Sequence, residues 1–405
     1  MQDVVTRSDF GELITPVYSP ASLIPVRGEG SYVWDADGRR YIDLAGGVAV
    51  TGLGHAHPDL VAALGAQSQA IWHIGNVFTN EPVLKLARQL TDATFGDRVF
   101  FANSGAEANE AALKLARKFA SDRASVNGQK FEIIAFDHSF HGRTLFTVSV
   151  GGQPKYSAGF GPLPIGIRHL PFNDVSSACV GISEKTCAVI VELVQGESGV
   201  KPAELEFVRA LRQRCDEVGA LLIFDEVQTG IGRTGCLFAY MDYGITPDIL
   251  TTAKALGNGF PIGAMITTAS IGDHFTAGSH GSTFGGNPLA ASVANKVLEI
   301  VQRPETLEGV KLRNRICLER LQEINRRINV FSEFRGRGLL IGAELNGNYR
   351  GRSAKLVEHA YAAGIFTLMA GPDVLRLAPS LVIPIDVLND GLAALERAVE
   401  TFAAE

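Results

Sequence analysis

Cysteine is scarce in this chain, and the few cysteines are too far apart to build a site together. Their number is odd, and no two form a Cys-x-x-Cys pair. The five are Cys179, Cys187, Cys215, Cys236 and Cys317. This pattern argues against a disulfide framework or a zinc site and is typical of reduced thiols in a cytoplasmic protein. The histidines His55 and His57 lack a third ligand at a suitable spacing, so we expect no metal.

An excess of positive charge and long apolar runs are lacking as well. The formal net charge of −6 argues against a surface that binds nucleic acid or anionic membranes. Apolar stretches such as residues 187–194 are too short to cross a bilayer, and residues 1–18 contain no apolar core of signal-peptide length. A composition of 46% hydrophobic and 20% charged residues is that of an ordinary globular protein. We therefore expect a soluble cytoplasmic protein without nucleic-acid or membrane partners.

Short apolar runs alternate with helical patterns through the middle of the chain. The runs are residues 98–102, 132–136, 187–194, 220–226, 248–254 and 263–268. Strands that are buried on both faces read as continuous apolar runs, and strand–helix alternation is typical of a parallel sheet. The sequence therefore predicts an α/β fold in which helices sandwich a mostly parallel central sheet.

The pattern changes on either side of this region. Residues 24–45 contain two β-like runs joined by the turn signal Asp-Ala-Asp-Gly. After residue 300 long charged helices come first, followed by an apolar run at 335–345 and a final helix at 386–403. We predict a large domain over residues 60–300 and a smaller α+β domain over 301–405, to which the N-terminal segment 1–59 contributes.

A small, open loop follows the predicted strand at 98–102 and leads into a helix. Its residues Ser104, Gly105 and Ala106 would present backbone amides at a helix N-terminus, which favours a phosphate. The chain has no GxxxxGK[ST] motif, so a nucleoside triphosphate is not expected. An ordinary N-capped helix is the alternative interpretation.

A second loop, FDHSFHGRT (136–144), follows the strand at 132–136. At the carboxyl edge of a parallel sheet, where ligands usually bind, Phe140 could stack on a flat ring. Arg143 could hold a carboxylate through two parallel hydrogen bonds. A packed phenylalanine with a surface arginine is the alternative.

Lys254 follows an apolar run and lies among small residues and glycines, where a charged amine is out of place. Burial lowers the pKa of an amine and so favours Schiff-base formation. Asp225 ends another buried strand, and a buried carboxylate needs a partner such as a protonated pyridine nitrogen. Gln228 is near enough in sequence to hydrogen-bond a ring hydroxyl. Together these residues indicate pyridoxal phosphate chemistry, the alternative being that Asp225 caps a helix.

Five motifs occur in order along the chain. They are NSGAEANE (103–110), FHGRT (140–144), DEVQTGIGRTG (225–235), AKALGNGFPIGA (253–264) and HGSTFGGNP (280–288). With these motifs, nearly the whole chain resembles the class III aminotransferases, which are pyridoxal-phosphate enzymes of fold type I. Within that class it is most similar to the acetylornithine and succinylornithine aminotransferases. The resemblance implies pyridoxal 5'-phosphate as cofactor and a homodimer with shared active sites.

The resemblance also implies a set of cofactor-binding residues. They are Ser104, Gly105, Ala106, Phe140, Asp225, Glu226, Val227, Gln228, Lys254 and Thr283. Lys254 would form the Schiff base and move the proton, while Asp225 would pair with the pyridine nitrogen. Phe140 would stack on the ring. Gly105 and Ala106 would hold the phosphate together with Thr283 of the partner subunit.

For the substrate, the resemblance implies that Arg143 binds the α-carboxylate, with Ser282 of the partner subunit close by. It further implies an ion pair between Glu197 and Arg376. When glutamate enters, Arg376 would be released to bind its α-carboxylate. When an acylornithine enters, Glu197 would mask the charge of Arg376, since an unpaired buried guanidinium is costly. A purely structural ion pair is the alternative.

Three positions depart from the pattern of the family. Leu193 stands where proline is usual, and Asn258 stands where a third glycine is usual after the lysine. Val48 occupies the region where ornithine aminotransferases carry a tyrosine that holds the free α-amine. The first two departures could alter loop shape or turnover, and the third favours an N-acylated substrate.

The sequence thus predicts a transaminase that moves the δ-amino group of N2-acetyl- or N2-succinyl-ornithine to 2-oxoglutarate in arginine metabolism. Another ω-aminotransferase acting on ornithine, 4-aminobutyrate or N-succinyl-diaminopimelate would use the same residues. An aminomutase or racemase of the same fold is a further alternative. A pyridoxal-phosphate-binding regulator would call for a basic DNA-binding segment, and the sequence shows none.

Overall fold

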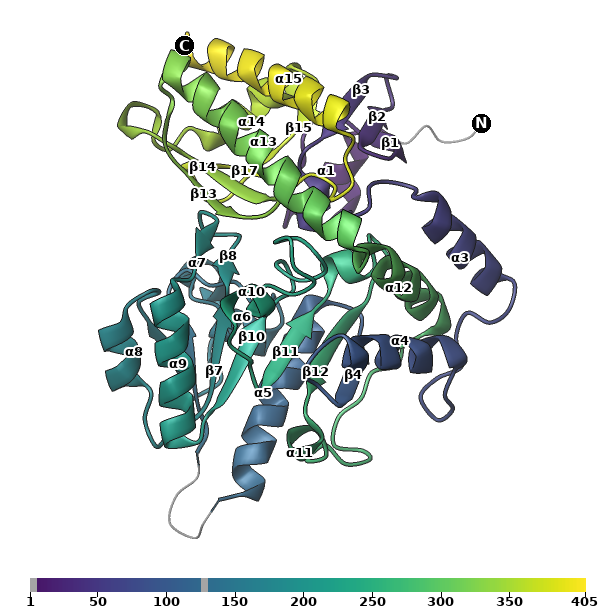
Figure 1. Cartoon of the computed structure of the whole chain (residues 1–405), viewed down its shortest axis with the longest axis vertical. Helices are drawn as coiled ribbons and strands as arrows, with labels where there is room; N and C mark the ends of the chain where they lie inside the picture. Colours follow the sequence, from purple (N-terminus) through teal and green to yellow (C-terminus); the bar gives the residue numbers. More distant parts are fainter. Residues whose placement is uncertain (1–5, 125–129) are drawn as a thin grey trace.

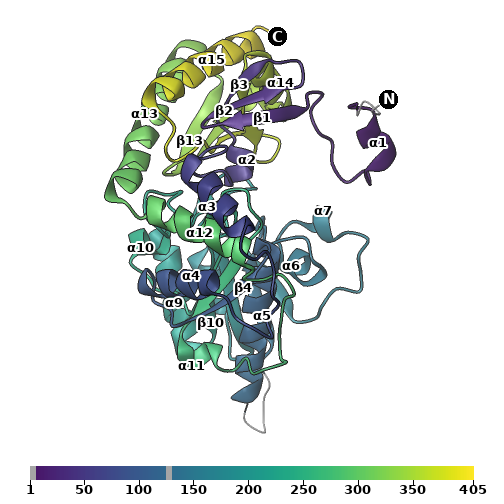
Figure 2. The same cartoon turned by 90° about the vertical axis from the view of Figure 1, so that its right-hand side faces the viewer.

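The structure, a computed structural model, describes residues 6–124 and 130–405. A large, helix-covered sheet occupies one half of the molecule, and two smaller sheets with three long helices occupy the other (Figure 1). The first three strands and the C-terminal helix both lie in the smaller half, although they come from opposite ends of the chain (Figure 2).

The large sheet has seven strands in the order β4-β12-β11-β10-β7-β5-β6. Their bounds are β4 Arg98–Ala102, β5 Glu132–Phe136, β6 Ile167–Leu170, β7 Thr186–Glu192, β10 Leu221–Asp225, β11 Ile249–Thr252 and β12 Gly263–Thr267. Strands β6, β5, β7, β10 and β11 run parallel, while β12 pairs antiparallel with both β11 and β4. The predicted mostly parallel sheet is confirmed.

Helices cover this sheet on both faces, which explains why its strands read as unbroken apolar runs. On β10, Leu222 and Phe224 join the core that includes Phe207 of α9 (Leu205–Val218). The alternate residues Leu221 and Ile223 join a second core with the alanines and leucines of α5 (Gly105–Asp122). Because successive side chains of a strand point to opposite faces, both sets must be apolar.

The smaller half contains two four-stranded sheets. One has the order β13-β14-β17-β16, with bounds Phe331–Arg337, Leu340–Leu345, Val374–Leu377 and Leu368–Met369. The other has the order β1-β2-β3-β15, with bounds Pro25–Glu29, Tyr32–Asp35, Arg40–Asp43 and Ile365–Phe366. The parallel pairing of β3 with β15 joins the N-terminal segment to the C-terminal one. The domain bounds at 59/60 and 300/301 stay a prediction.

The long helices of the smaller half are α13 (Pro304–Ile328), α14 (Ser353–Ala362) and α15 (Ile385–Ala403). The remaining α-helices are α1 Asp9–Leu13, α2 Gly46–Ala49, α3 Pro58–Ser68, α4 Glu81–Asp92, α6 Leu145–Val150, α7 Pro154–Ser157, α8 Val175–Gly181, α10 Tyr240–Tyr243, α11 Ala269–Gly272 and α12 Pro288–Val301. Short 3₁₀ turns lie at η1 (Lys254–Leu256) and η2 (Gly347–Tyr349), and a two-stranded ribbon joins β8 (Val194–Gln195) to β9 (Lys201–Pro202). None of the helices in the described chain is both long and apolar enough to span a bilayer.

Two details of the sheet differ from the sequence prediction. The apolar run at 187–194 is divided, because β7 ends at Glu192 and Val194 starts the ribbon with β9. Strand β6 has no counterpart among the predicted runs. It is an edge strand in which Arg168 and His169 are exposed, so its sequence lacks a continuous apolar run.

Candidate active site

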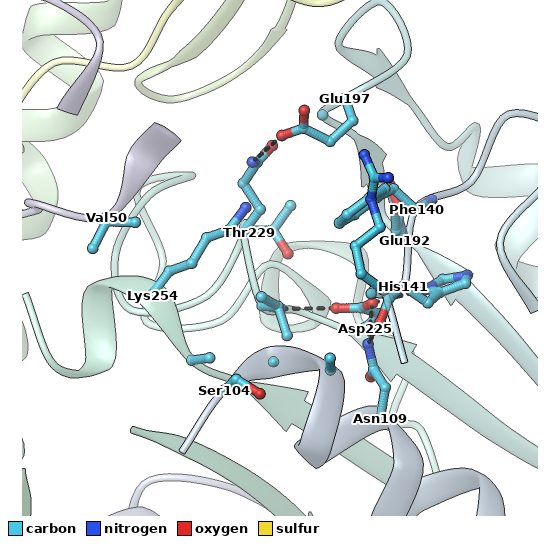
Figure 3. Close-up of a pocket in the computed structure, with 18 of the residues that line it drawn as sticks. Val50, Ser104, Asn109, Phe140, His141, Glu192, Glu197, Asp225, Thr229 and Lys254 are labelled. Carbon is cyan, nitrogen blue, oxygen red and sulfur yellow. Dashed lines mark hydrogen bonds and ion pairs between the residues drawn. The ribbon is translucent and has the colours of Figure 1, made fainter. Parts of the chain in front are cut away.

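A cavity of about 400 Å³ opens at the carboxyl edge of the large sheet. Strands β5, β7, β10 and β11 end at this edge, and the antiparallel strand β12 begins there. These strand ends and the segments after them therefore meet in space. Glu192 and Asp225 end β7 and β10, Phe140 and Lys254 follow β5 and β11, and all four line the cavity (Figure 3). This is the position where open α/β sheets bind ligands.

The N-terminus of α5 forms one end of the cavity, where Ser104, Gly105 and Ala106 line the wall. Ser104 is the N-cap, and its hydroxyl accepts a hydrogen bond from the Glu107 N–H at 3.2 Å. A Cβ at position 105 would lie 2.6 Å from Val227 Cγ1, so only glycine allows this close approach. The first-turn N–H groups and the helix dipole make this end of the cavity suitable for a phosphate.

Asp225 lies at the base of the cavity and is only 4% exposed. One of its oxygens accepts from the Val227 N–H at 3.0 Å. The other, Oδ2, accepts from Asn109 Nδ2 at 2.8 Å and lies 2.7 Å from His141 Nδ1. These partners hold the carboxylate in one orientation, as a buried charge requires.

Asn109 and His141 also line the cavity and contact Asp225, and the sequence reasoning missed both. His141 stands inside the quoted FHGRT motif, and Asn109 is on α5, one turn beyond Gly105. Thr251 Oγ1 in turn donates to Asn109 Oδ1 at 2.7 Å and orients its amide. A buried Asp225 carboxylate needs at least two hydrogen-bond donors, and this requirement could have pointed to both residues.

Lys254 lies on the opposite wall, beside Val50 (Figure 3). It begins the 3₁₀ turn η1 and has a φ of 45°, an uncommon conformation for a lysine. Burial lowers the pKa of the Lys254 amine, and the Glu197 carboxylate acts in the opposite direction. A lowered pKa makes the uncharged, nucleophilic form of the amine accessible.

The Glu197 carboxylate lies at the rim of the cavity and pairs with Arg376 of β17. Arg376 Nη1 is 2.7 Å from Glu197 Oε1 and donates to the Gly196 carbonyl at 2.7 Å. Burial alone would raise the pKa of Glu197, but the Arg376 guanidinium and the Lys254 amine together hold it below its ordinary value. Gln228 Nε2 donates to the same Glu197 oxygen at 3.2 Å. The structure therefore joins the two residues that the sequence reasoning had paired.

Phe140 and Arg143 form the third side of the cavity. The Arg143 guanidinium lies 3.7 Å from the centre of the Tyr156 ring and 5.6 Å from that of Phe140. The Phe140 N–H donates to Glu192 Oε1 at 2.7 Å and so anchors the loop. Burial, followed by the nearby Asp225 carboxylate, raises the pKa of Glu192 well above its usual range. Glu192 was not among the predicted site residues.

Four predicted residues do not line this cavity: Glu226, Ser282, Thr283 and Arg376, the last of which contacts the rim through Glu197. The Glu226 carboxylate accepts hydrogen bonds from the N–H groups of Ala239 and Tyr240 at 2.6 and 2.8 Å. It points away from Asp225 because neighbouring side chains at a strand end alternate in direction. Burial raises the pKa of Glu226 to about 7. In this chain its carboxylate therefore holds residues 239–240, and its expected role in cofactor binding stays a prediction.

Ser282 and Thr283 lie outside the cavity of their own chain. Thr283 lines a small separate recess, and the Ser282 carbonyl accepts from Asn76 Nδ2 at 2.7 Å. Their expected roles in the cavity of a partner subunit stay a prediction.

The groups around the cavity fit a phosphorylated pyridine ring. The end at Gly105 can take the phosphate, Asp225 can face a ring nitrogen, and Phe140 offers an aromatic face. Gln228 also lines the cavity, and its buried Oε1 has no hydrogen-bond partner among the described residues, so it is free for a ligand donor. Among those same residues, no three His, Cys, Asp or Glu side chains come together as a metal site.

Comparison with known proteins supports these observations. The model of the aminotransferase class-III family matches residues 14–399. A succinylornithine transaminase from Yersinia pseudotuberculosis serotype O:1b (strain IP 31758) is 58% identical over 400 residues, covering 98% of this chain and 97% of the relative. An acetylornithine/succinyldiaminopimelate aminotransferase from Yersinia pestis is also 58% identical, with the same coverage of both chains.

Solved structures agree with the sequence comparison. The crystal structure of N-acetylornithine aminotransferase from Stenotrophomonas maltophilia K279a has a TM-score of 0.85 and 42% identity, covering 96% of this chain and 98% of the other. An ornithine aminotransferase structure from Toxoplasma gondii has a TM-score of 0.92 and 30% identity, covering 98% and 95%. That structure is described as showing partial occupancy of PLP at its active site.

Proposed function

The chain belongs to the class III aminotransferases, and from this premise we propose that it transfers the δ-amino group of an N2-acylated ornithine to 2-oxoglutarate. The products are the N-acylglutamate 5-semialdehyde and glutamate. Acyl-ornithine transamination is supported by the names of its relatives, and the reaction places the protein in arginine metabolism. We include both N2-acetyl- and N2-succinyl-ornithine as amino donors.

The class III family depends on pyridoxal phosphate, and we propose that this chain binds it in the cavity described above. Ser104, Gly105 and Ala106 would hold the phosphate, and Phe140 would cover the ring. Val227 and Gln228 would flank the ring from the other side. When bound, the cofactor supplies an electron sink for the carbon that carries the amino group.

Two side chains of this chain would carry the chemical work. Lys254 would hold the cofactor covalently, and its amine would then accept and return the proton of the substrate carbon. Asp225, fixed by Asn109 and His141, would keep a positive charge on the ring nitrogen. Arg143 would bind a substrate carboxylate at the mouth of the cavity.

The observation that carries the choice of substrate is the Glu197–Arg376 pair. Arg376 is almost wholly buried, while the Glu197 side chain is 28% exposed and borders the cavity. A closed pair offers a neutral wall to the chain of an acylornithine. An open pair exposes the guanidinium, which can take the α-carboxylate of glutamate. One cavity can therefore accept two amino donors of different charge.

Replacing Glu197 with alanine should impair the use of acylornithine more than the use of glutamate. Without its partner, Arg376 stays open for a carboxylate, so we expect kcat/KM for the acylornithine to fall about tenfold relative to glutamate. Half-reaction kinetics with each donor measure this ratio. Glu344→Ala, which removes the half-buried partner of Arg335 outside the cavity, is the matched control. Equal effects of Glu197→Ala on both donors would contradict the switch.

The substrate proposal is tested by comparing kcat/KM for several amino donors side by side, with 2-oxoglutarate as acceptor. We expect acetylornithine and succinylornithine to exceed free ornithine and 4-aminobutyrate by at least about tenfold, because a site suited to an acylated nitrogen leaves a charged amine unpaired. N-succinyl-diaminopimelate is the second candidate donor, since the Yersinia pestis relative is named for it. A clear preference for ornithine or 4-aminobutyrate would overturn the proposal.

We further propose a cytoplasmic homodimer. Trp72, Val77, Phe78 and Phe284 are 65%, 92%, 66% and 59% exposed in the single chain, next to the segment that contains Thr283. Large apolar side chains gathered in this way mark a protein interface. Burying them against a second copy would bring Thr283 of the partner subunit toward the cavity. None of the five cysteines pairs with another in the described chain, and a reducing compartment is part of the proposal.

A further inference from the structure

Asn258 connects the two segments that form the Lys254 side of the cavity. It lies in the lysine loop, residues 254–262, of which Lys254 and 259–262 line the cavity. Its side-chain Oδ1 accepts from the Leu53 N–H at 2.7 Å, and its Nδ2 donates to the Gly54 carbonyl at 2.9 Å. One amide thus holds two consecutive residues of the segment 50–54, here called the N-terminal wall. Val50, the first residue of this wall, lines the same cavity.

The N-terminal wall follows a strained stretch of backbone. Gly46, Gly47, Val48 and Ala49 have φ values of 57°, 55°, 68° and 60°, so four residues in a row are left-handed. This conformation is unfavourable for alanine and more so for the β-branched Val48. Such strain persists only where surrounding contacts hold the chain in place.

The contacts that hold the N-terminal wall come from two parts of the chain, the C-terminal segment and the lysine loop. The Gly52 carbonyl accepts from Ser380 Oγ and the Leu381 N–H, both of which belong to the C-terminal segment. Asn258 is the side chain that ties the same wall to the lysine loop. Leu53 and Gly54 are buried, so their peptide groups need the partners that Asn258 supplies.

The residue type suits this position for two separate reasons. Position 258 has a φ of 48°, which asparagine adopts more readily than most residues. Glycine would adopt it as easily but would leave both peptide groups of the wall without the clamp. Lys254, in contrast, is held by its own turn, in which the Leu256 N–H donates to Ala253 and the Gly257 N–H to Lys254.

We propose that Asn258 is a positioning residue for the substrate: it sets the distance between Val50 and Lys254 and so the width of the cavity for the amino donor. This inference rests on the proposed function only in naming acylornithine as the amino donor that the cavity accepts. Because the lysine turn does not depend on the clamp, Asn258 acts on substrate affinity and not on the chemical step.

The test compares Asn258→Gly with Asn173→Gly. Asn173 also has a positive φ, of 63°, and its amide likewise forms two bonds, to the Pro202 carbonyl at 3.1 Å and from the Glu204 N–H at 2.9 Å. It does not line the cavity. The two variants therefore lose the same kind of clamp at a similar cost in thermal stability, one beside the cavity and one away from it.

For Asn258→Gly we expect KM for acetylornithine to rise about tenfold with kcat within about twofold of the unsubstituted protein. Calorimetry with N2-acetyl-L-norvaline, which lacks the terminal amine and cannot react, should show the same rise in Kd. Asn173→Gly should change neither constant. An unchanged KM in Asn258→Gly, or an equal rise in both variants, would overturn the inference.

Two further arms keep the test decisive. If Asn258→Gly does not fold, Asn258→Asp is the substitute, because it keeps the acceptor for Leu53 and loses the donor to Gly54. Its KM should lie between that of the unsubstituted protein and a value about tenfold higher. An unchanged KM in Asn258→Asp would then count against the clamp. If the unsubstituted protein prefers a different amino donor, the proposed function fails. The KM comparison of the two glycine variants with that donor still decides the role of Asn258.

Discussion

Replacing Lys254 with alanine is expected to lower kcat for amino-group transfer by at least about 10⁴-fold, because both covalent attachment and proton transfer are lost. The Lys254 amine lies on the Val50 side of the cavity. Burial lowers the pKa of this amine, which favours its uncharged form. Alanine is the natural choice of substitute because it removes the amine and leaves the short turn η1 intact.

The Lys254→Ala experiment has two readouts. The purified unsubstituted protein should be yellow, and the variant should lose or shift this visible absorbance. Lys355→Ala, which removes an exposed lysine of α14, is the control and should change neither colour nor turnover. A colourless unsubstituted protein, or normal turnover in Lys254→Ala, would refute the assignment of this lysine and with it the cofactor.

Replacing Asp225 with asparagine is expected to lower kcat by about 10²- to 10³-fold, the usual effect of removing one preorganised charge from an active site. Asparagine has nearly the same shape but cannot stabilise a positive charge on the ring nitrogen. Its Oδ1 can still accept from one of the donors that now hold Asp225. The loss should therefore appear in kcat more than in the folding of the chain.

Asp248→Asn provides the matched control for Asp225→Asn. Asp248 immediately precedes β11, at the other edge of the same sheet, where it accepts from Arg212 and from the Leu222 N–H at 2.9 and 2.7 Å. We expect this variant to lose stability while retaining kcat. The visible spectrum of Asp225→Asn should shift, since the charge next to the ring changes. A kcat for Asp225→Asn within a few-fold of the unsubstituted protein would contradict the pairing.

Much of the cavity could be predicted from residues that directly follow apolar runs. Asp225 ends a strand of the large sheet, while Ser104, Phe140 and Lys254 each follow one. Parallel strands bring their carboxyl ends to one edge. The place of each residue relative to its strand was therefore enough to predict that the four lie near one another.

The residues that were missed or misplaced depend on side-chain direction. Glu226 follows Asp225 directly, yet the two carboxylates point to different partners because strand residues alternate. Asn109 and His141 reach Asp225 from 116 and 84 residues away in sequence. No local pattern of sequence records such a contact, since it depends on how α5 and the loop after β5 pack on the sheet.

By itself, the sequence of this protein determined the α/β architecture and the groups near the strand ends, such as Ser104, Phe140, Asp225 and Lys254, that face the cavity. Periodicity and strand-end chemistry are local properties, so they can be followed along the chain. Only the tertiary structure decided which groups hold one another: Asp225 with Asn109 and His141, Glu197 with Arg376, and Asn258 with the peptide groups of Leu53 and Gly54. The physical reason is that hydrogen bonds act over about 3 Å, and only folding brings residues so distant in sequence that close.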